Sequence, residues 1–267
     1  MMPSADSATR VSVLQVAWAA DRLTARDWAI SLSVARLRLA TSDQLERLHF
    51  AELAGTSRSR IRRRVLARLV AWRVLVTSPR RIGGERAGSS GLVFALGAVG
   101  LRLVRPDDTG RRPDGVLAGV LAPHTLQASE LYVRLMEHAR SSDFRLDAFD
   151  TEPACWRQVA PRGWLKPDAY LSLVSPQYRD QWFVEIDQGT EHLPVMRRKC
   201  ETYLDYMKRS NQEPDAVMPR VLFSVPDNKR WRDVASVTST IRGAPADLFK
   251  VATHERAAAR LVEILLE

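Results

Sequence analysis

Acidic side chains gather between residues 166 and 199 at spacings that suit metal chemistry. Asp168 comes at the start of one apolar run, and Glu185 and Asp187 come at the end of the next. Because alternate side chains of a β-strand point to the same side, we expect Glu185 and Asp187 to share a face. Two carboxylates held that close repel each other and favour a divalent cation, and Asp168 and Glu191 offer further oxygen ligands. The pattern predicts a metal site suited to phosphate chemistry.

A second interpretation of these acids is structural. Carboxylates at strand ends are commonly solvated, and the sequence Asp187-Gln188-Gly189 is typical of a turn. The combination of Pro167-Asp168 at one strand with a Glu-x-Asp pair ending the next favours the metal site.

The elements that must position these acids form a predicted α/β domain over residues 123–267. Short apolar runs predict strands, and apolar residues at helical spacing predict helices. Strands interspersed with helices favour a compact α/β fold. The predicted strands are Phe144–Phe149, Ala169–Val174, Trp182–Ile186 and Val221–Val225, and the predicted helices are about Leu126–Ala139, Met196–Lys208 and Ala257–Leu266.

The first half of the chain has a different pattern. Three helices are predicted, the second of them after a capping box formed by Thr41 and Gln44, and two short strands then flank a basic loop at residues 78–91. Three helices followed by a basic hairpin is the order of a winged helix-turn-helix. The predicted boundaries are a flexible tail at residues 1–22, a winged-helix domain at residues 23–104 and a linker at residues 105–122.

The positive charge of the chain is concentrated in this first half. Residues 1–115 hold 20 Arg, no Lys and 10 acidic residues, whereas residues 116–267 hold 20 basic and 21 acidic residues. Such a module indicates a polyanionic partner, here double-stranded DNA, although a compositional bias toward arginine or a solvated helix face would give the same count. The candidates for the major groove, with no acid among them, are Arg58, Arg60, Arg62 and Arg63 on the third helix, and those for the wing are Arg80 and Arg81.

The acidic stretch resembles motifs of known DNA-processing proteins. Pro167-Asp168 followed by Glu185-Ile186-Asp187 resembles the PD-(D/E)xK core of restriction-endonuclease-like nucleases, and the string from Glu185 to Glu191 resembles the ExDxxxE signature of MOB-C relaxases. With a winged helix ahead of these motifs, the chain resembles the replication-relaxation family of actinobacterial plasmids and conjugative elements. The resemblance implies a restriction-endonuclease-like domain that nicks or cleaves DNA with a divalent metal, in plasmid replication or mobilisation.

The resemblance also implies roles for individual residues. Asp168 and Glu185 would bind Mg²⁺ or Mn²⁺, with Glu130 of the first helix as an added ligand. The usual core has a lysine two residues after the glutamate, where this chain has an aspartate. Lys199, on the helix after the motif, is the expected substitute, and Lys166 is a second candidate. If neither reaches the site, the domain is an inactive relative that only binds.

Two nucleophiles are compatible with these residues. A metal held by Asp168, Glu185 and Asp187 would activate a water for in-line attack on a phosphodiester, with the lysine neutralising charge in the transition state. Alternatively, Tyr203 or Tyr206 would attack and stay joined to the DNA. Core packing is the more common reason for tyrosines at helical spacing, so we expect water.

Two functions remain open from the sequence. The first is a DNA-processing enzyme in which the winged helix selects the site and the second domain acts on the backbone. The alternative is a non-catalytic winged-helix regulator or replication accessory protein whose second domain serves dimerisation or partner binding. A homodimer and complexes with replication or conjugation proteins are the further partners to test.

Length and composition exclude several other classes. A chain of 267 residues with 45% hydrophobic and 27% charged side chains fits one or two folded domains and neither a disordered nor a fibrous protein. No apolar run approaches the roughly 18 residues of a membrane span and the start lacks a signal-peptide pattern, so we expect a cytoplasmic protein. Cys155 and Cys200 are too few for a disulfide scaffold and are expected to be buried thiols.

Overall fold

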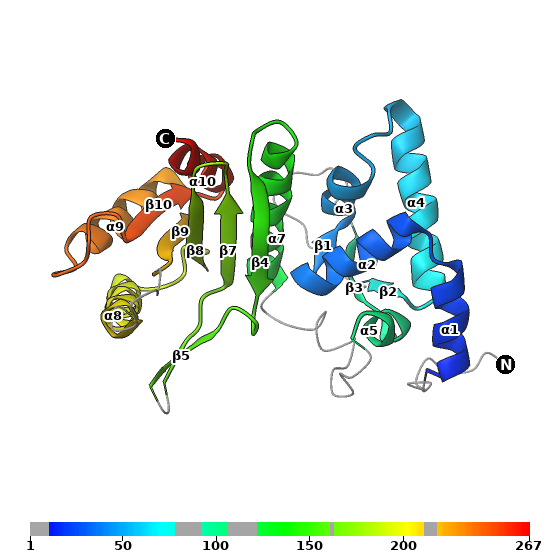
Figure 1. The fold of residues 1–267 in the computed structure, drawn as a ribbon, viewed down its shortest axis with the longest axis horizontal. Coiled ribbons are helices and arrows are strands. Elements are labelled where there is room, and N and C mark those ends of the chain that lie inside the picture. The colour runs from blue at the N-terminus through cyan, green and yellow to red at the C-terminus, as the bar shows by residue number, and fades with distance from the viewer. Residues whose placement is uncertain (1–10, 78–91, 106–121, 161–162, 211–217) are drawn as a thin grey trace. The chain divides into compact units, whose positions relative to one another are not determined.

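The computed structural model describes residues 11–77, 92–105, 122–160, 163–210 and 218–267. The chain divides into two compact units, Met1–Val120 and Leu121–Glu267, so the division falls inside the segment expected to be a linker. Both units contain helices and strands (Figure 1), and the mixed α/β class expected from the sequence is confirmed. Within the described residues, no helix combines the length and the hydropathy that a membrane crossing requires.

The first unit combines helices with a small three-stranded sheet. In chain order its described elements are α1 (Val13–Arg22), α2 (Ala25–Leu37), β1 (Ala40–Thr41), α3 (Ser42–His49), α4 (Gly55–Ala71), β2 (Leu75–Thr77), β3 (Val93–Leu96) and α5 (Ala98–Val104). Strand β3 lies in the centre of the sheet and pairs antiparallel with both β1 and β2. The order of α2, α3, α4 and the β2–β3 pair follows the order of elements expected from the sequence.

Reciprocal side-chain caps fix the starts of α2 and α3. The backbone N–H of Thr41 donates to the Gln44 side chain at 2.9 Å, and the N–H of Gln44 donates to the Thr41 hydroxyl at 3.1 Å, which confirms the predicted capping box. Thr24 and Asp27 make the same pair ahead of α2. Such caps supply partners for N–H groups that a helix start leaves unpaired.

Asp27 also ties α2 to α4. Its side chain is fully buried, and Arg68 donates to its two carboxylate oxygens at 2.5 and 2.7 Å. A buried carboxylate needs such a partner, because an unpaired charge in the core is strongly destabilising. The sequence analysis did not single out this pair.

Three parts of the first unit differ from the sequence interpretation. Helix α1 occupies half of the expected tail, and it is held by packing: Ala19 is fully buried, and the rings of Trp18 and Trp72 meet edge to face at 5.1 Å. A helix this short is marginal without such contacts, so its own sequence gives a weak signal. Helix α5 is also short, so the sequence did not predict it either. The third difference is the start of α4: the sequence Thr56-Ser57-Arg58-Ser59 predicts a capped start, whereas α4 begins at Gly55 without a side-chain cap.

The second unit is built on a five-stranded sheet. In chain order its described elements are α7 (Ala122–Ala139), β4 (Arg145–Thr151), β5 (Arg157–Ala160), β6 (Gly163–Leu165), β7 (Ala169–Val174), β8 (Arg179–Ile186), α8 (Leu193–Ser210), β9 (Arg220–Val225), α9 (Asn228–Ser239), β10 (Phe249–Thr253) and α10 (Ala257–Leu266). The strand order is β10-β9-β8-β7-β4, with β4, β7 and β8 antiparallel and β8, β9 and β10 parallel. Parallel neighbours need a crossover, which α8 and α9 supply. Strands β5 and β6 form a separate hairpin.

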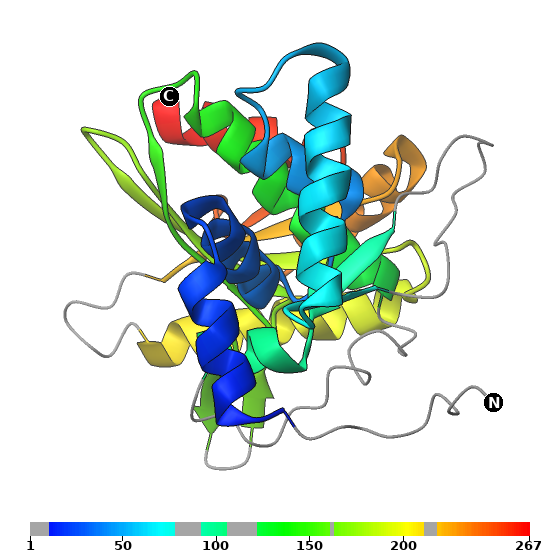
Figure 2. The same ribbon diagram turned by 90° about the vertical axis from the view of Figure 1, so that its right-hand side faces the viewer.

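Helices cover both faces of this sheet. Phe183 of β8 and Phe223 of β9 share one core with Tyr203 of α8 and Val234 of α9. Helices α7 and α10 contact each other and the sheet, and Figure 2 shows them across the sheet from α8. A strand covered on both faces is expected to be apolar throughout, so a charged residue inside β8 needs a specific partner.

Most elements of the second unit were predicted from local patterns. Strand β7 and helix α10 have the predicted bounds, and the other predicted elements are present with ends shifted by a few residues. The sequence analysis missed β5, β6, α9 and β10. Helix α9 has a short apolar stripe, of which Val234 and Val237 are the buried members, and β10 is only five residues long, so neither produces a clear period.

Candidate functional site

Asp168 and Glu185 lie side by side at the junction of β7 and β8. The strand register pairs Ala169 with Val184, which makes these two acids the next pair along the ladder. Their side chains are 13% and 5% exposed. One oxygen of Asp168 accepts a hydrogen bond from the backbone N–H of Ile186 at 2.6 Å. Burial, followed by the charge of Glu185, raises the pKa of Asp168 well above its usual value.

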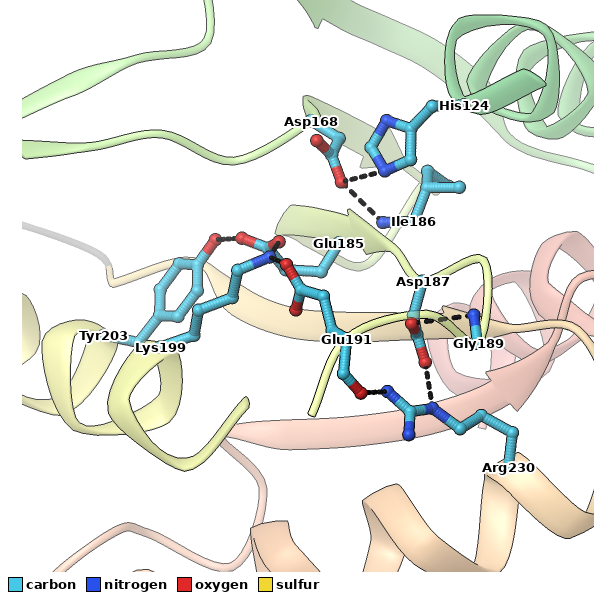
Figure 3. Close-up of polar contacts among 10 residues, drawn as sticks. All are labelled: His124, Asp168, Glu185, Ile186, Asp187, Gly189, Glu191, Lys199, Tyr203 and Arg230. Carbon is cyan, nitrogen blue, oxygen red and sulfur yellow. Dashed lines mark hydrogen bonds and ion pairs between the residues drawn. The ribbon is translucent and has the colours of Figure 1, made fainter. Parts of the chain in front are cut away.

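Lys199 of α8 reaches this pair, as the sequence analysis expected. Its Nζ donates to Glu185 at 3.0 Å and lies 2.8 Å from a carboxylate oxygen of Glu191, so one ammonium joins two of the predicted acids (Figure 3). Although burial opposes the charged form, Glu185 and Glu191 together raise the pKa of Lys199 above its usual value. The lysine therefore stays protonated at neutral pH.

Tyr203, one turn beyond Lys199 on α8, holds the second oxygen of Glu185. Its hydroxyl donates to Glu185 at 2.6 Å, and the side chain is fully buried. Burial, followed by the charge of Glu185, raises the pKa of Tyr203 well above its usual value. Tyr203 thus fixes the orientation of the carboxylate. Tyr206, the other tyrosine considered, packs against the ring of Phe183 with centroids 5.9 Å apart.

Asp187 has a different partner. Its side chain is 2% exposed and forms an ion pair with Arg230 of α9, and its other oxygen accepts from the N–H of Gly189 at 2.9 Å. Gly189 has a φ of 79°, which confirms the turn predicted there. Arg230 also donates to the carbonyl of Glu191 at 2.6 Å. The structure therefore gives Asp187 a guanidinium where a metal was expected.

The ion pairs that Glu185 and Asp187 make differ in their access to solvent. Lys199 and Glu191 are 36% and 34% exposed, whereas Arg230 is 12% exposed. The end of the site around Lys199 and Glu191 is therefore open to solvent, and the end around Asp187 is covered.

Helix α7 contributes a histidine in place of the predicted glutamate. Glu130 accepts from Arg134 at 2.9 Å within the helix, whereas His124 lies 3.3 Å from an oxygen of Asp168. Only the packing of α7 on the sheet brings His124 there, so the sequence offered no signal for it. In the described parts of the chain, no three His, Cys, Asp or Glu side chains form a group that could hold a metal ion.

The remaining candidates of the second unit lie elsewhere. Lys166 stacks over the ring of Trp156, with its Nζ 4.6 Å from the ring centroid. Cys155 and Cys200 are buried free thiols, as expected, and burial raises the pKa of each to about 12.

The arginines of α4 divide into two groups. Arg60 and Arg63 are exposed, as is the neighbouring Arg64. Arg58 instead donates to the carbonyls of Leu53 and Ala51 at 2.7 and 3.1 Å, and so closes the loop before the helix.

Arg62 pairs with Glu46 of α3 at 2.6 Å, with both side chains largely covered. Residues 58–64 contain no acid, but Arg62 still has an acidic partner because the neighbouring helix α3 supplies Glu46. Arg80 and Arg81 lie outside the described residues.

Comparison with known proteins gives one match. No curated protein and no solved structure matches the chain. A model of the family described as replication-relaxation matches residues 32–221, which include α4, the Asp168–Glu185 pair and Lys199. Since the match covers most of the sequence, the chain belongs to the replication-relaxation family.

Proposed function

We propose that this protein binds double-stranded DNA with its first unit and acts on a phosphodiester with its second, in the replication or mobilisation of a plasmid or mobile element. Its family membership supports the biological setting. The observation that carries the proposal is the convergence of Asp168, Glu185 and Lys199 at the open end of the site. These residues supply the two carboxylates and the ammonium that a PD-(D/E)xK-type nuclease requires.

The first unit suits a winged helix-turn-helix. Helices α2, α3 and α4 precede the antiparallel β2–β3 pair, and the exposed Arg60, Arg63 and Arg64 lie on α4. An α-helix fits the major groove of B-DNA, about 12 Å wide, and arginines on its surface contact phosphates and base edges there. We therefore assign duplex binding to α4, and to Arg60 and Arg63 in particular.

The carboxylates of the second unit fit Mg²⁺ or Mn²⁺. Magnesium in phosphate-processing sites is commonly held by one or two carboxylates together with substrate phosphates and waters. Asp168 and Glu185 supply the two carboxylates. Burial raises the pKa of Asp168 first and the charge of Glu185 second, and an ion would relieve this second effect. When bound, the ion would activate a water and polarise the phosphate. Asp187 and Glu130 have arginine partners in the structure and fit this role less well.

The protein groups around the ion have separate roles. Lys199 places a permanent positive charge beside Glu185, where it would stabilise negative charge that develops on the phosphate. Tyr203 is a positioning residue that orients Glu185. Because its hydroxyl is buried and retains its proton, water is the better candidate nucleophile. Glu191 balances the charge of the lysine.

Nicking of supercoiled plasmid in Mg²⁺ or Mn²⁺ tests the proposal. The wild type should convert plasmid to open circles, and Glu185→Gln and Asp168→Asn should each lose about 100-fold or more of this activity, in line with the loss of an essential catalytic group. Glu201→Gln, which changes an exposed acid of α8, serves as the control. Absence of nicking by a folded wild type, or unchanged nicking by Glu185→Gln, would overturn the catalytic assignment.

One observation favours a second candidate, a non-catalytic DNA-binding accessory protein. Lys199 and Arg230 already neutralise the acids of β8, and the described residues offer no group of three ligands for a metal. On this account Lys199 takes the place of the ion. The second candidate predicts salt-sensitive duplex binding with no dependence on divalent metal.

A further inference from the structure

The hairpin of β5 and β6 presents an exposed aromatic side chain close to the candidate site. Trp164 is 54% exposed and lies opposite the exposed Gln158. The next residue, Leu165, is buried in the core shared with α8. Because neighbouring side chains of a strand alternate, Trp164 points away from that core. A large indole left in solvent at this position is available to a ligand.

Lys166 and Trp156 extend the same face of the hairpin. Residues two apart along a strand share a side. Lys166 therefore lies on the same outward face as Trp164, and Trp156 lies on the same face as Gln158. The stacking of Lys166 over Trp156 agrees with this placement. The outward face thus carries one exposed indole, an ammonium and an amide, and Lys166 covers the half-buried Trp156.

The charge around the hairpin is positive. Arg209, exposed near the end of α8, donates to the carbonyl of Val159 at 2.9 Å and so lies along the edge of β5. The described hairpin residues, 156–160 and 163–166, include no acid. Indole faces together with ammonium and guanidinium groups are the combination that binds nucleic-acid bases and phosphates.

We propose that this hairpin face binds a single DNA strand, with a base stacked on Trp164 and phosphates on Lys166 and Arg209. A single strand is favoured because stacking requires a base whose face is free, and a duplex covers those faces. Asp168 follows Lys166 by two residues, so the two lie no more than about 7 Å apart along the chain. A DNA strand bound to Lys166 would therefore reach the candidate site. The inference rests on the proposed action of the second unit on DNA.

Fluorescence anisotropy with a labelled oligothymidylate in EDTA tests the inference. Trp164→Ala should weaken binding by about 5- to 150-fold, the range for loss of one stacked base, and Trp164→Phe should recover most of the affinity. Trp231→Ala, which removes a 42% exposed tryptophan from α9, is the matched control and should bind as the wild type does. Lys166→Ala should lower the salt slope by about 0.7, and Lys229→Ala should leave it unchanged.

The same measurements are repeated in an Arg60→Ala/Arg63→Ala/Arg64→Ala background, in which the substitutions remove the contribution of α4 to binding. Unchanged binding by Trp164→Ala in that background, or no binding by its parent, would overturn the inference. Equal losses for single strand and duplex would also overturn it. The assay needs neither metal nor cleavage, so the two proposals can fail separately. If the hairpin binds single strands but the protein does not nick plasmid, the inference stands and the catalytic proposal fails. If Trp164→Ala binds single strands normally and the protein nicks plasmid, the inference fails and the catalytic proposal stands.

Discussion

The two units use their charged side chains in opposite ways. Helix α4 of the first unit leaves Arg60 and Arg63 in solvent, whereas strand β8 of the second unit buries Glu185 and Asp187 and gives each a cationic partner. Exposed charges cost little to keep and attract a polyanion over a distance. Buried charges need a partner, because removing an ion from water costs several kcal/mol. The exposed arginines of α4 therefore indicate binding, whereas the paired acids at the end of β8 indicate a built site.

The largest expected effect is on plasmid nicking. It separates two roles of Lys199, which either stabilises charge in a nuclease or takes the place of an ion in a non-catalytic protein. Lys199→Met should lower plasmid nicking about 100- to 1,000-fold, comparable to removing one group that stabilises transition-state charge. Lys208→Met changes an exposed lysine on the same helix and should leave nicking unchanged. If Lys199 instead takes the place of an ion, Lys199→Met should acquire a thermal stability that rises with added Mn²⁺, and no nicking should be seen with either protein.

The next effect concerns the closed ion pair of the second unit. Arg230→Met leaves the Asp187 carboxylate buried without its partner, and should lower the free energy of unfolding by about 3–5 kcal/mol in urea denaturation. Adding Asp187→Asn to the same chain should recover part of the loss. Arg256→Met, on an exposed pair with Glu263, should cost no more than about 1 kcal/mol. A loss below that value for Arg230→Met would show that Asp187 is stable without a cation.

Substitution of the exposed arginines of α4 should change DNA binding and leave stability almost unchanged. Arg60→Ala/Arg63→Ala/Arg64→Ala should lower the salt slope of duplex binding by about 1 for each arginine that contacts a phosphate. The free energy of unfolding should change by no more than about 0.5 kcal/mol per site, since these side chains are exposed. Arg102→Ala, which changes an exposed arginine of α5, is the control. An unchanged salt slope would remove α4 from the DNA interface.

The smallest effect is a pH dependence at His254. Burial lowers the pKa of His254 from its usual 6.5 to about 4, and its Nδ1 lies 2.8 Å from the Ser224 hydroxyl. At this residue the unfolded chain binds more protons in this range, so the contribution of His254 to stability should fall as pH drops from about 6.5 to about 4. Because the ring is only partly buried, the slope should stay below about 1.4 kcal/mol per pH unit. His254→Asn should flatten it, and an unchanged profile would contradict the assignment.

The reach of sequence analysis differs between the candidate residues. The strand positions of Asp168 and Glu185 followed from local apolar runs, and Lys199 was expected because its helix follows the motif closely. Their proximity is set by the register of β7 on β8, which the alternation of side chains along each strand makes predictable. In contrast, Arg230 lies 43 residues from Asp187 in the chain, and nothing in the local sequence of α9 indicated that it would reach β8.

The sequence by itself determined the capping box ahead of α3, the bounds of β7 and α10 and the uneven distribution of charge, because these depend on residue types and on neighbours a few residues apart. Only the tertiary structure decided which charges are paired. Glu46 meets Arg62, and Arg230 meets Asp187, through the packing of separate helices and strands. A charged side chain gives no local sign of a distant partner, since the free energy of the pair arises only after folding has removed both groups from water.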